Sequence, residues 1–364
     1  MFYLTLRKET PLIFRVSVPI ASILLTILFG IFIFSVLGYD PGKALYHFFI
    51  SPLSRIDRIA DLFVKACPLM IIGTGLVLCF RANIWNIGAE GQLIMGAVFA
   101  GGLALSFPDT LNIWLLPAMA VLSFLGGGLW AFLPAVLKVR LRTNEILVSL
   151  MLTYVASLFL DWLVRGPWRS PTSFGFPLTN YYPDVGLISK INFPGIGTIG
   201  QLHWGVFIAL LVCLLFWFMM QKTVFGFQVK LVGDSDKAFR YSGFNESKTT
   251  MMLFIISGGL AGLAGMIEVS ANMGQLQPNI SFGYGFTAII VAFLARLNPA
   301  AVILAGLLIA LIEMGGDSAQ IALAIPKVVT GVFKGILLFF LLAGETLTKY
   351  QINFKYSKRG VPYD

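Results

Sequence analysis

Charged side chains are scarce in this chain of 364 residues. Asp, Glu, Lys and Arg together make up 12% of it, about half the share found in an ordinary soluble domain. Hydrophobic residues make up 57%, and the mean hydropathy is +0.85. A soluble enzyme, a disordered tail and a nucleic-acid-binding module are all excluded by this composition.

Histidine and cysteine are also rare in this chain, and their scarcity argues against catalysis and metal binding. The two histidines, His47 and His203, have no acidic neighbours at helical spacing. The three cysteines stand in apolar stretches without metal-ligand spacing, so we interpret them as packing residues. The glycine pattern at 195–200 matches a dinucleotide fingerprint by letters only, because no soluble strand–helix unit surrounds it. We therefore predict no enzyme activity and no cofactor in this chain.

Long apolar runs dominate the rest of the chain, and most of them approach the roughly 20 residues that a membrane span requires, although the eighth, 285–295, is short. They predict an all-α polytopic membrane protein with about ten transmembrane helices over residues 1–348, followed by a tail at 349–364. Internal Gly, Pro or polar residues favour broken or re-entrant helices in the second, third, eighth and ninth segments. The ten segments are 16–37, 59–80, 84–107, 112–137, 143–164, 202–220, 249–272, 285–295, 299–314 and 321–343.

The net charge of +9 fits a membrane protein, because Lys and Arg collect in cytoplasmic loops and near lipid headgroups. Their distribution predicts that both termini and the tail are cytoplasmic. The loop at 165–201 is then extracytoplasmic, and its Pro, Gly and aromatic residues predict a non-helical lid or docking surface. The loop at 221–248 is cytoplasmic, polar and basic, and we expect a short helix near 235–241 between flexible glycines.

Polar side chains mark two places within the apolar segments. Asn86, Glu90 and Gln92 stand at the head of the third segment, where they either line a translocation path or cap a broken helix. Lys327 and Lys334 are seven residues apart in the last segment and share a helix face. Glu313 is the nearest candidate partner, so we expect a buried ion pair; contact with an anionic or carbonyl-rich substrate is the alternative.

A family resemblance follows from residues 86–92, Asn-Ile-Gly-Ala-Glu-Gly-Gln. This run strongly resembles the signature of ABC-importer permeases of the ribose/branched-chain amino acid class, and most closely the simple-sugar and nucleoside branch. Similar blocks occur at 144–146, 151–154, 285–292 and 296–299, although Thr153 stands where that branch has Asn. These motifs are specific for the family and weak for the substrate.

The resemblance implies roles for two sets of residues. The 221–248 loop resembles the coupling segment that docks on an ATPase subunit; a merely solvated loop near anionic lipid is the alternative. Glu268 either lines the path or caps a neighbour. The expected coupling residues are Gly226, Gly233, Asp234, Ala238, Phe239, Tyr241 and Gly243. The expected path or gating residues are Asn86, Glu90, Gln92, Asn144, Glu145 and Glu268.

The resemblance also implies a function: a permease subunit of an ATP-driven importer in a bacterial inner membrane. Its partners would be an ABC ATPase that carries ATP and Mg, a second and unlike permease, and an extracytoplasmic binding lipoprotein. The substrate expected is a nucleoside, with a riboflavin-like solute or a simple sugar also open. Two other classes remain: a proton-coupled secondary transporter that uses Glu90, Glu268 or Glu313 without an ATPase, and a membrane anchor without transport.

Overall fold

The protein is described here from a computed structural model, which describes residues 2–6, 12–195, 197–234, 239 and 241–354. Among these residues, eight helices are long and apolar enough to cross a membrane, and two shorter apolar helices accompany them. The main helices are α1 Leu12–Val36, α3 Ile56–Arg81, α4 Ala89–Ser106, α5 Leu115–Leu141, α6 Glu145–Arg165, α7 Gly205–Lys222, α8 Val224–Asp234, α10 Glu246–Glu268, α11 Tyr284–Leu294, α12 Ala301–Leu323 and α13 Val328–Lys349.

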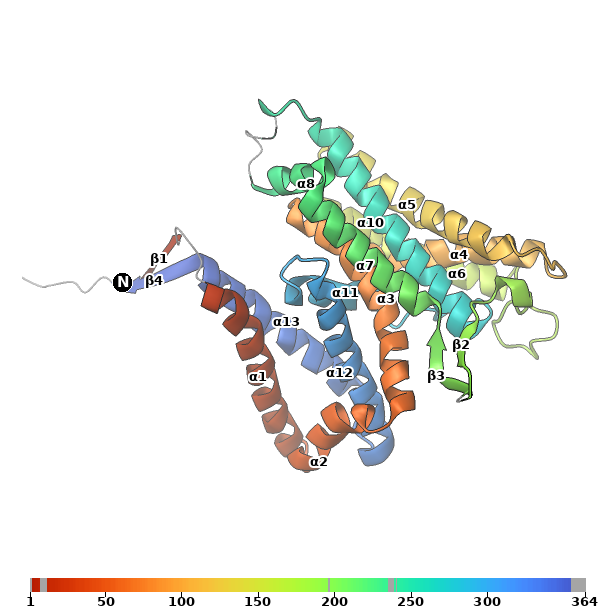
Figure 1. Cartoon of the computed structure of the whole chain (residues 1–364), viewed down its shortest axis with the longest axis horizontal. Coiled ribbons are helices and arrows are strands. Elements are labelled where there is room, and N and C mark those ends of the chain that lie inside the picture. The colour runs from red at the N-terminus through yellow and green to blue at the C-terminus, as the bar shows by residue number, and fades with distance from the viewer. Residues whose placement is uncertain (1, 7–11, 196, 235–238, 240, 355–364) are drawn as a thin grey trace, which may run out of the picture.

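Helix α3 is the centre of the molecule. It packs against α10 and α7 on one side and against α11 and α12 on the other. Figure 1 shows α4, α5, α6, α7 and α10 as one group of helices, with α1, α12 and α13 as a second group beside it. The apolar window of α3 is 89% buried, so any movement between the two groups must act on this helix.

Backbone contacts hold α4, α5 and α10 together, because small residues line the faces where they meet. A Cβ atom added to Gly96 of α4 would lie 2.1 Å from the Gly262 Cα of α10, and one added to Gly127 of α5 would lie 2.8 Å from that same Cα. Such small-residue faces allow membrane helices to pack at backbone distance. The glycine run at 257–265 is therefore a packing surface.

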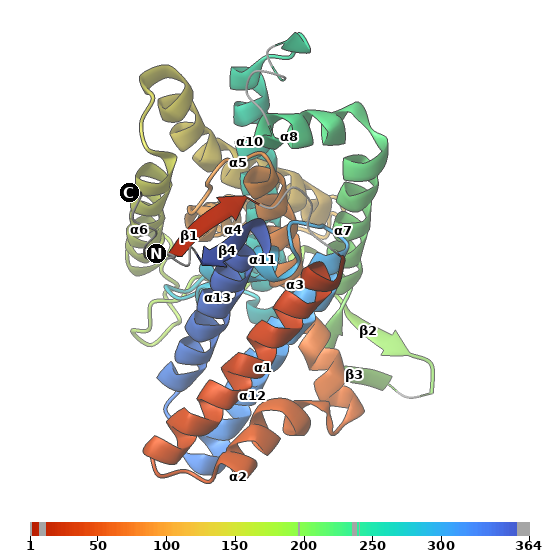
Figure 2. The ribbon, with the colours of Figure 1, turned by 90° about the vertical axis from the view of Figure 1, so that its left-hand side faces the viewer.

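Two small antiparallel strand pairs depart from the all-helical expectation. The strands β1 Phe2–Leu6 and β4 Tyr350–Phe354 pair near the ends of the chain, side by side in Figure 2. Strands β2 Lys190–Phe193 and β3 Gly197–His203 form a hairpin, mostly within the loop at 165–201. The rest of that loop contains one short 3-10 turn, Asp184–Gly186. Short helical turns at 41–53, including α2 Pro41–Leu45, connect α1 to α3.

Several predicted boundaries were wrong by a few residues. Residues 84–88 precede α4 without helical structure, and residues 202–203 belong to β3. Helix α12 continues past residue 314 to Leu323, so residues 321–323 do not belong to α13. The left-handed conformation of Ala324, with φ 54°, ends α12. Hydropathy alone could not mark this end, because both helices are apolar.

The expectation of broken helices was right in part. The second and ninth segments are continuous helices, α3 and α12, although Pro68 lies inside α3. Proline is tolerated there because neighbouring helices and polar side chains satisfy the freed backbone groups. The third segment begins after a non-helical stretch, and the eighth, α11, has only 11 residues. These two helices begin beside each other inside the molecule.

Candidate translocation site

The polar residues before α4 form a closed hydrogen-bonded set. The Asn86 amide donates to Gln92 Oε1 at 2.9 Å and to Ser257 Oγ at 3.1 Å, and the Gln92 amide donates back to Asn86 Oδ1 at 2.9 Å. The Gly88 N–H also donates to Asn86 Oδ1, at 3.1 Å. All of these side chains are buried. This geometry matches the capped, broken-helix interpretation of Asn86 and Gln92.

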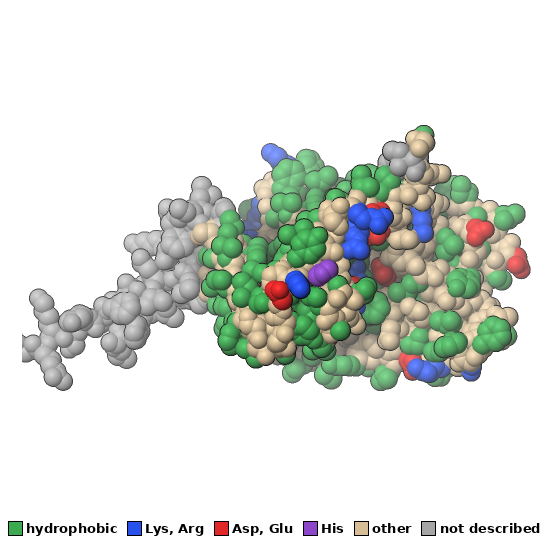
Figure 3. All heavy atoms as spheres, turned by 90° about the horizontal axis from the view of Figure 1, so that it is seen from below, with side chains coloured by type: hydrophobic (Ala, Val, Ile, Leu, Met, Phe, Trp, Pro, Cys, Tyr) green, Lys and Arg blue, Asp and Glu red, His purple; other side chains and the backbone are tan. Residues whose placement is uncertain are grey.

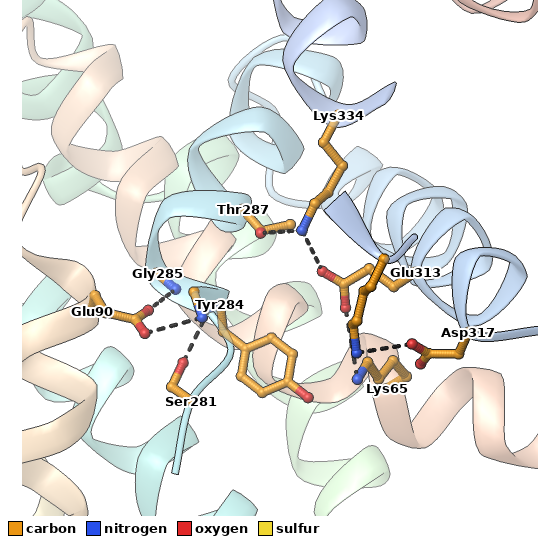
Figure 4. A network of polar contacts seen from close by, with 11 residues as sticks. Lys65, Glu90, Ser281, Tyr284, Gly285, Thr287, Glu313, Asp317 and Lys334 are labelled. Atoms are coloured by element: carbon orange, nitrogen blue, oxygen red, sulfur yellow. Dashed lines mark hydrogen bonds and ion pairs between the residues drawn. The ribbon is translucent and has the colours of Figure 1, made fainter. Parts of the chain in front are cut away.

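Glu90 connects the two helices that begin inside the molecule. Its Oε1 accepts from the Gly283 N–H at 3.2 Å and its Oε2 from the Gly285 N–H at 2.6 Å, at the start of α11 (Figure 4). A carboxylate is favourable at a helix N-terminus, where unpaired N–H groups and the helix dipole carry positive charge. A Cβ atom on Gly285 would lie 2.2 Å from the Glu90 nitrogen. Only glycine permits this contact.

A second network lies beside α11 and joins four helices. Lys334 of α13 donates to Glu313 Oε1 of α12 at 2.8 Å and to Thr287 Oγ1 of α11 at 3.1 Å. Lys65 of α3 lies 3.8 Å from Glu313 Oε2. Figure 4 shows these side chains pointing toward one another from separate helices. The structure therefore pairs Lys334 with Glu313, whereas Lys327 pairs with Asp317 at 2.9 Å.

These charges line a pocket of about 340 Å³. Lys65 is nine residues into α3, or about 14 Å along the helix, and follows the charged residues Asp57, Arg58 and Asp61 of its first turns. Seen from the end that carries α2 and the β2–β3 hairpin, basic and acidic side chains gather near the middle of the face (Figure 3). The lining residues are Lys65, Phe282, Glu313, Asp317, Lys327, Val328, Thr330, Gly331 and Lys334.

The other expected path residues lie in separate contacts. Asn144 caps α6, because its Oδ1 accepts from the Ile146 N–H at 2.9 Å. The Glu145 carboxylate forms an ion pair with Lys138 of α5. Glu268 ends α10, is 6% exposed, and accepts from the Asn272 amide at 2.9 Å. None of the six residues expected to line the path is among the residues that line this pocket.

The expected coupling loop contains a helix that the sequence did not predict. Gly226, Gly233 and Asp234 belong to α8, so the first two are not flexible joints. A Cβ atom on Gly233 would lie 2.0 Å from the Arg81 carbonyl oxygen at the end of α3. This close contact holds α8 against α3.

Beyond α8, the remaining coupling residues differ in exposure. Phe239 is buried, whereas Tyr241 is 93% exposed. Gly243 has a left-handed φ of 78° and marks the turn before α10. Ala238, and most of the helix expected at 235–241, lie outside the described residues.

A comparison with known protein families decides the class of this chain. Residues 58–342 match the family described as branched-chain amino acid transport system / permease component. The chain belongs to this permease family. It is a multi-pass membrane protein of the ABC transporter permease class, as the motif at 86–92 predicted.

Named relatives of the permease span nearly its whole length. A glucose ABC transporter permease of Haloferax volcanii is 30% identical and covers 97% of this chain and 94% of its own. A guanosine ABC transporter permease of Bacillus subtilis is 28% identical, over 94% of this chain and 97% of its own. A nucleoside ABC transporter permease of Lactococcus lactis is 26% identical, over 89% and 90%. The relatives thus agree on the transporter class and differ in the solute that they name.

Lys65, Phe282 and Asp317 of the permease pocket were not predicted from the sequence. Lys65 falls within the apolar segment 59–80. The same signal that singled out Lys334, a charge inside a span, could have found it. Asp317 was missed because the ninth segment was ended too early. Phe282 carries no sequence signal, because its place depends on the loop before α11.

Proposed function

We propose that this permease is the membrane subunit of an ABC importer for a nucleoside or a related small solute, such as a riboflavin-like compound or a simple sugar. It acts in a bacterial inner membrane with an ABC ATPase, a second and unlike permease, and an extracytoplasmic binding lipoprotein. ATP and Mg act on the ATPase, outside this chain. Two of the relatives named above carry guanosine and nucleosides in their names, which supports the nucleoside.

The observation that supports coupling most directly is the contact between α8 and α3. Gly233 touches the backbone of Arg81, and α3 carries Lys65 into the pocket at the other end. The two residues of α3 are about 24 Å apart along the helix. Because α3 is a continuous helix, a displacement of α8 by a partner tilts α3 and changes the Lys65–Glu313 contact. Closure of the ATPase pair would then switch the permease between inward- and outward-facing states.

Copurification from native membranes, followed by mass spectrometry, tests the assembly. We expect an ATPase, a second permease and a binding protein to accompany this chain, and uptake to require ATP. The importer would be contradicted if the chain were recovered alone and showed full uptake that a protonophore abolishes. That result would favour the proton-coupled transporter.

Tyr241 provides a sharper test of the docking surface, because it is 93% exposed and its substitution leaves the packing unchanged. We expect Tyr241→Glu to weaken ATPase association and ATP-dependent uptake at least about tenfold, as for a residue central to an interface. Phe174→Glu is the matched control, since Phe174 is 98% exposed in the other long loop. Its ATPase association should equal that of the wild type. Equal association in the Tyr241 variant would contradict docking at this segment.

A further inference from the structure

Lys65 is a partly buried cation whose hydrogen-bonding capacity is not used. Among the described residues its ammonium donates no hydrogen bond, and its nearest acid, Glu313, is 3.8 Å away and already bound to Lys334 at 2.8 Å. An ammonium group has three donors. The Lys65 side chain is 23% exposed, into the pocket. Its contacts are the ion pair with Glu313 and the rings of Phe282 and Tyr284, which leave its hydrogen-bond donors available to a ligand with acceptor atoms.

Phe282 gives the same pocket an aromatic surface. Its side chain is 61% exposed, whereas the neighbouring Tyr284 is 3% exposed. The ammonium groups of Lys65 and Lys327 lie 5.7 Å and 5.4 Å from the centre of the Phe282 ring. The ring is exposed and both ammonium groups lie over it, so a flat heterocycle that contacts the ring can bring its edge atoms to these donors.

The charged residues of the pocket indicate which chemical groups its ligand carries. The pocket holds the three lysines Lys65, Lys327 and Lys334 against the two acids Glu313 and Asp317. It therefore offers more donors than acceptors, which suits carbonyl oxygens and ring nitrogens. Asp317 is 40% exposed and accepts hydrogen bonds, as hydroxyl groups require. A hexose also offers hydroxyl acceptors to the lysines, but its ring is not flat, so the contact with Phe282 is what distinguishes a nucleoside base from a hexose in this pocket.

On the basis of the proposed import function, we infer that this pocket is a transit site for nucleosides. The base stacks on Phe282, its carbonyl oxygen and ring nitrogens accept from Lys65 and Lys327, and the ribose hydroxyls donate to Asp317. The volume of about 340 Å³ lies at the lower end of the range for small-molecule sites. This transit site would act after release from the binding protein and would add selectivity of its own.

The experiment measures equilibrium binding of labelled guanosine and labelled glucose to the permease–ATPase complex in nanodiscs, without the binding protein. We expect guanosine to bind, and Lys65→Met to weaken binding about tenfold or more, as the loss of a hydrogen bond from a charged donor predicts. Phe282→Leu should weaken it about tenfold through lost stacking. Lys65→Met keeps the Glu313–Lys334 pair intact. The matched control is Lys43→Met, because Lys43 lies on the exposed surface of α2.

ATP-dependent uptake by the complete importer separates failure of the site from failure of the proposed function. If Lys65→Met and Phe282→Leu leave both the uptake and the binding of guanosine unchanged, the transit site is overturned while the import function stands. Absence of guanosine binding to the wild-type complex would overturn the site, as would preferential binding of glucose. Absence of ATP-dependent uptake of every tested solute would instead contradict the import function.

Discussion

Single residues in this permease have roles that follow from their hydrogen bonds. Glu90 is buried, yet its two oxygens accept from backbone N–H groups at the start of α11. It therefore acts first as a cap that fixes α11 against α4, in a place where water cannot satisfy those groups. Glu313 is different, because its carboxylate meets two lysines and borders an open pocket. Of the two acids, Glu313 is the one placed to respond to a solute.

His203 allows a test at the residue scale, outside the membrane spans. Burial, together with the nearby charge of Lys190, lowers the pKa of His203 from 6.5 to about 4. Its Nδ1 accepts from the Gly205 N–H at 3.1 Å, which requires the neutral ring. Because the folded pKa lies below the unfolded one, this stabilisation is complete above pH 6.5 and is lost as the pH falls toward 4.

We therefore expect the stability of the wild type to fall between pH 6.5 and 4.5 by on the order of 2 kcal/mol more than that of His203→Asn. Asparagine keeps an acceptor for the Gly205 N–H but does not titrate. The stability of both proteins is measured by thermal unfolding in the same detergent across this pH range. Parallel pH curves for the two proteins would show that His203 is not held neutral by the fold.

At the scale of elements, packing between helices is decided by where glycine permits backbone contact. The α4, α5 and α10 helices meet at Gly96, Gly127 and Gly262 with no room for a side chain. Helix α13 differs, since Gly331 and Gly335 have no atom within 4 Å of an added Cβ. The same residue type therefore marks a contact surface in one helix and open space in another.

Alanine substitutions should separate these two cases. A Cβ atom on Gly262 would lie 2.2 Å from the Ser123 carbonyl oxygen, so Gly262→Ala must displace a helix backbone. We expect it to destabilise the permease by about 1–3 kcal/mol, as overpacking does. Gly335→Ala, the control, should be neutral or stabilise by up to about 1 kcal/mol because alanine favours helix. Differential scanning calorimetry would measure both, and equal melting temperatures would contradict the close contact.

At the scale of the whole molecule, two groups of helices meet at α3, and polar contacts reinforce this junction. Lys65, Thr287, Glu313 and Lys334 each come from a different helix of α3, α11, α12 and α13. The coupling helix α8 contacts α3 at its other end through Gly233. The same helix thus connects the surface expected to meet the ATPase with the pocket expected to pass the solute.

The Glu313–Lys334 pair should stabilise this junction in a way that a double-mutant cycle can measure. Lys334→Met leaves Glu313 buried with Lys65 at 3.8 Å as its remaining partner, and we expect a loss of about 3–5 kcal/mol. Adding Glu313→Gln should recover part of that loss, because the buried carboxylate is then neutral, although Lys65 loses its ion pair with Glu313.

The Lys327–Asp317 pair is the matched control, since its side chains are 55% and 40% exposed. Removing Lys327 should change the stability by less than about 1 kcal/mol. Thermal unfolding of the variants in the presence of the partner subunits makes the comparison. Equal effects at Lys327 and Lys334 would show that burial does not distinguish the two pairs.

The sequence by itself determined the class of the molecule and the positions of its apolar segments. A bilayer requires that each spanning segment be apolar and satisfy its own backbone, so hydropathy and local motifs carry that information. The motif at 86–92 likewise indicated the permease family, and Lys334 indicated a polar feature in the last helix. The expected shared helix face of Lys327 and Lys334 was wrong, because Lys327 precedes the first residue of α13.

Only the tertiary structure decided which of these groups meet. Glu90 contacts Gly283 and Gly285, and Lys65 approaches Glu313, across more than 190 residues of sequence. No local pattern encodes such pairings, because they depend on how helices pack around α3. The packing of Gly233 on Arg81 similarly turned an expected flexible loop into the helix α8. Spans follow from local hydropathy, whereas the pocket follows from contacts between distant segments.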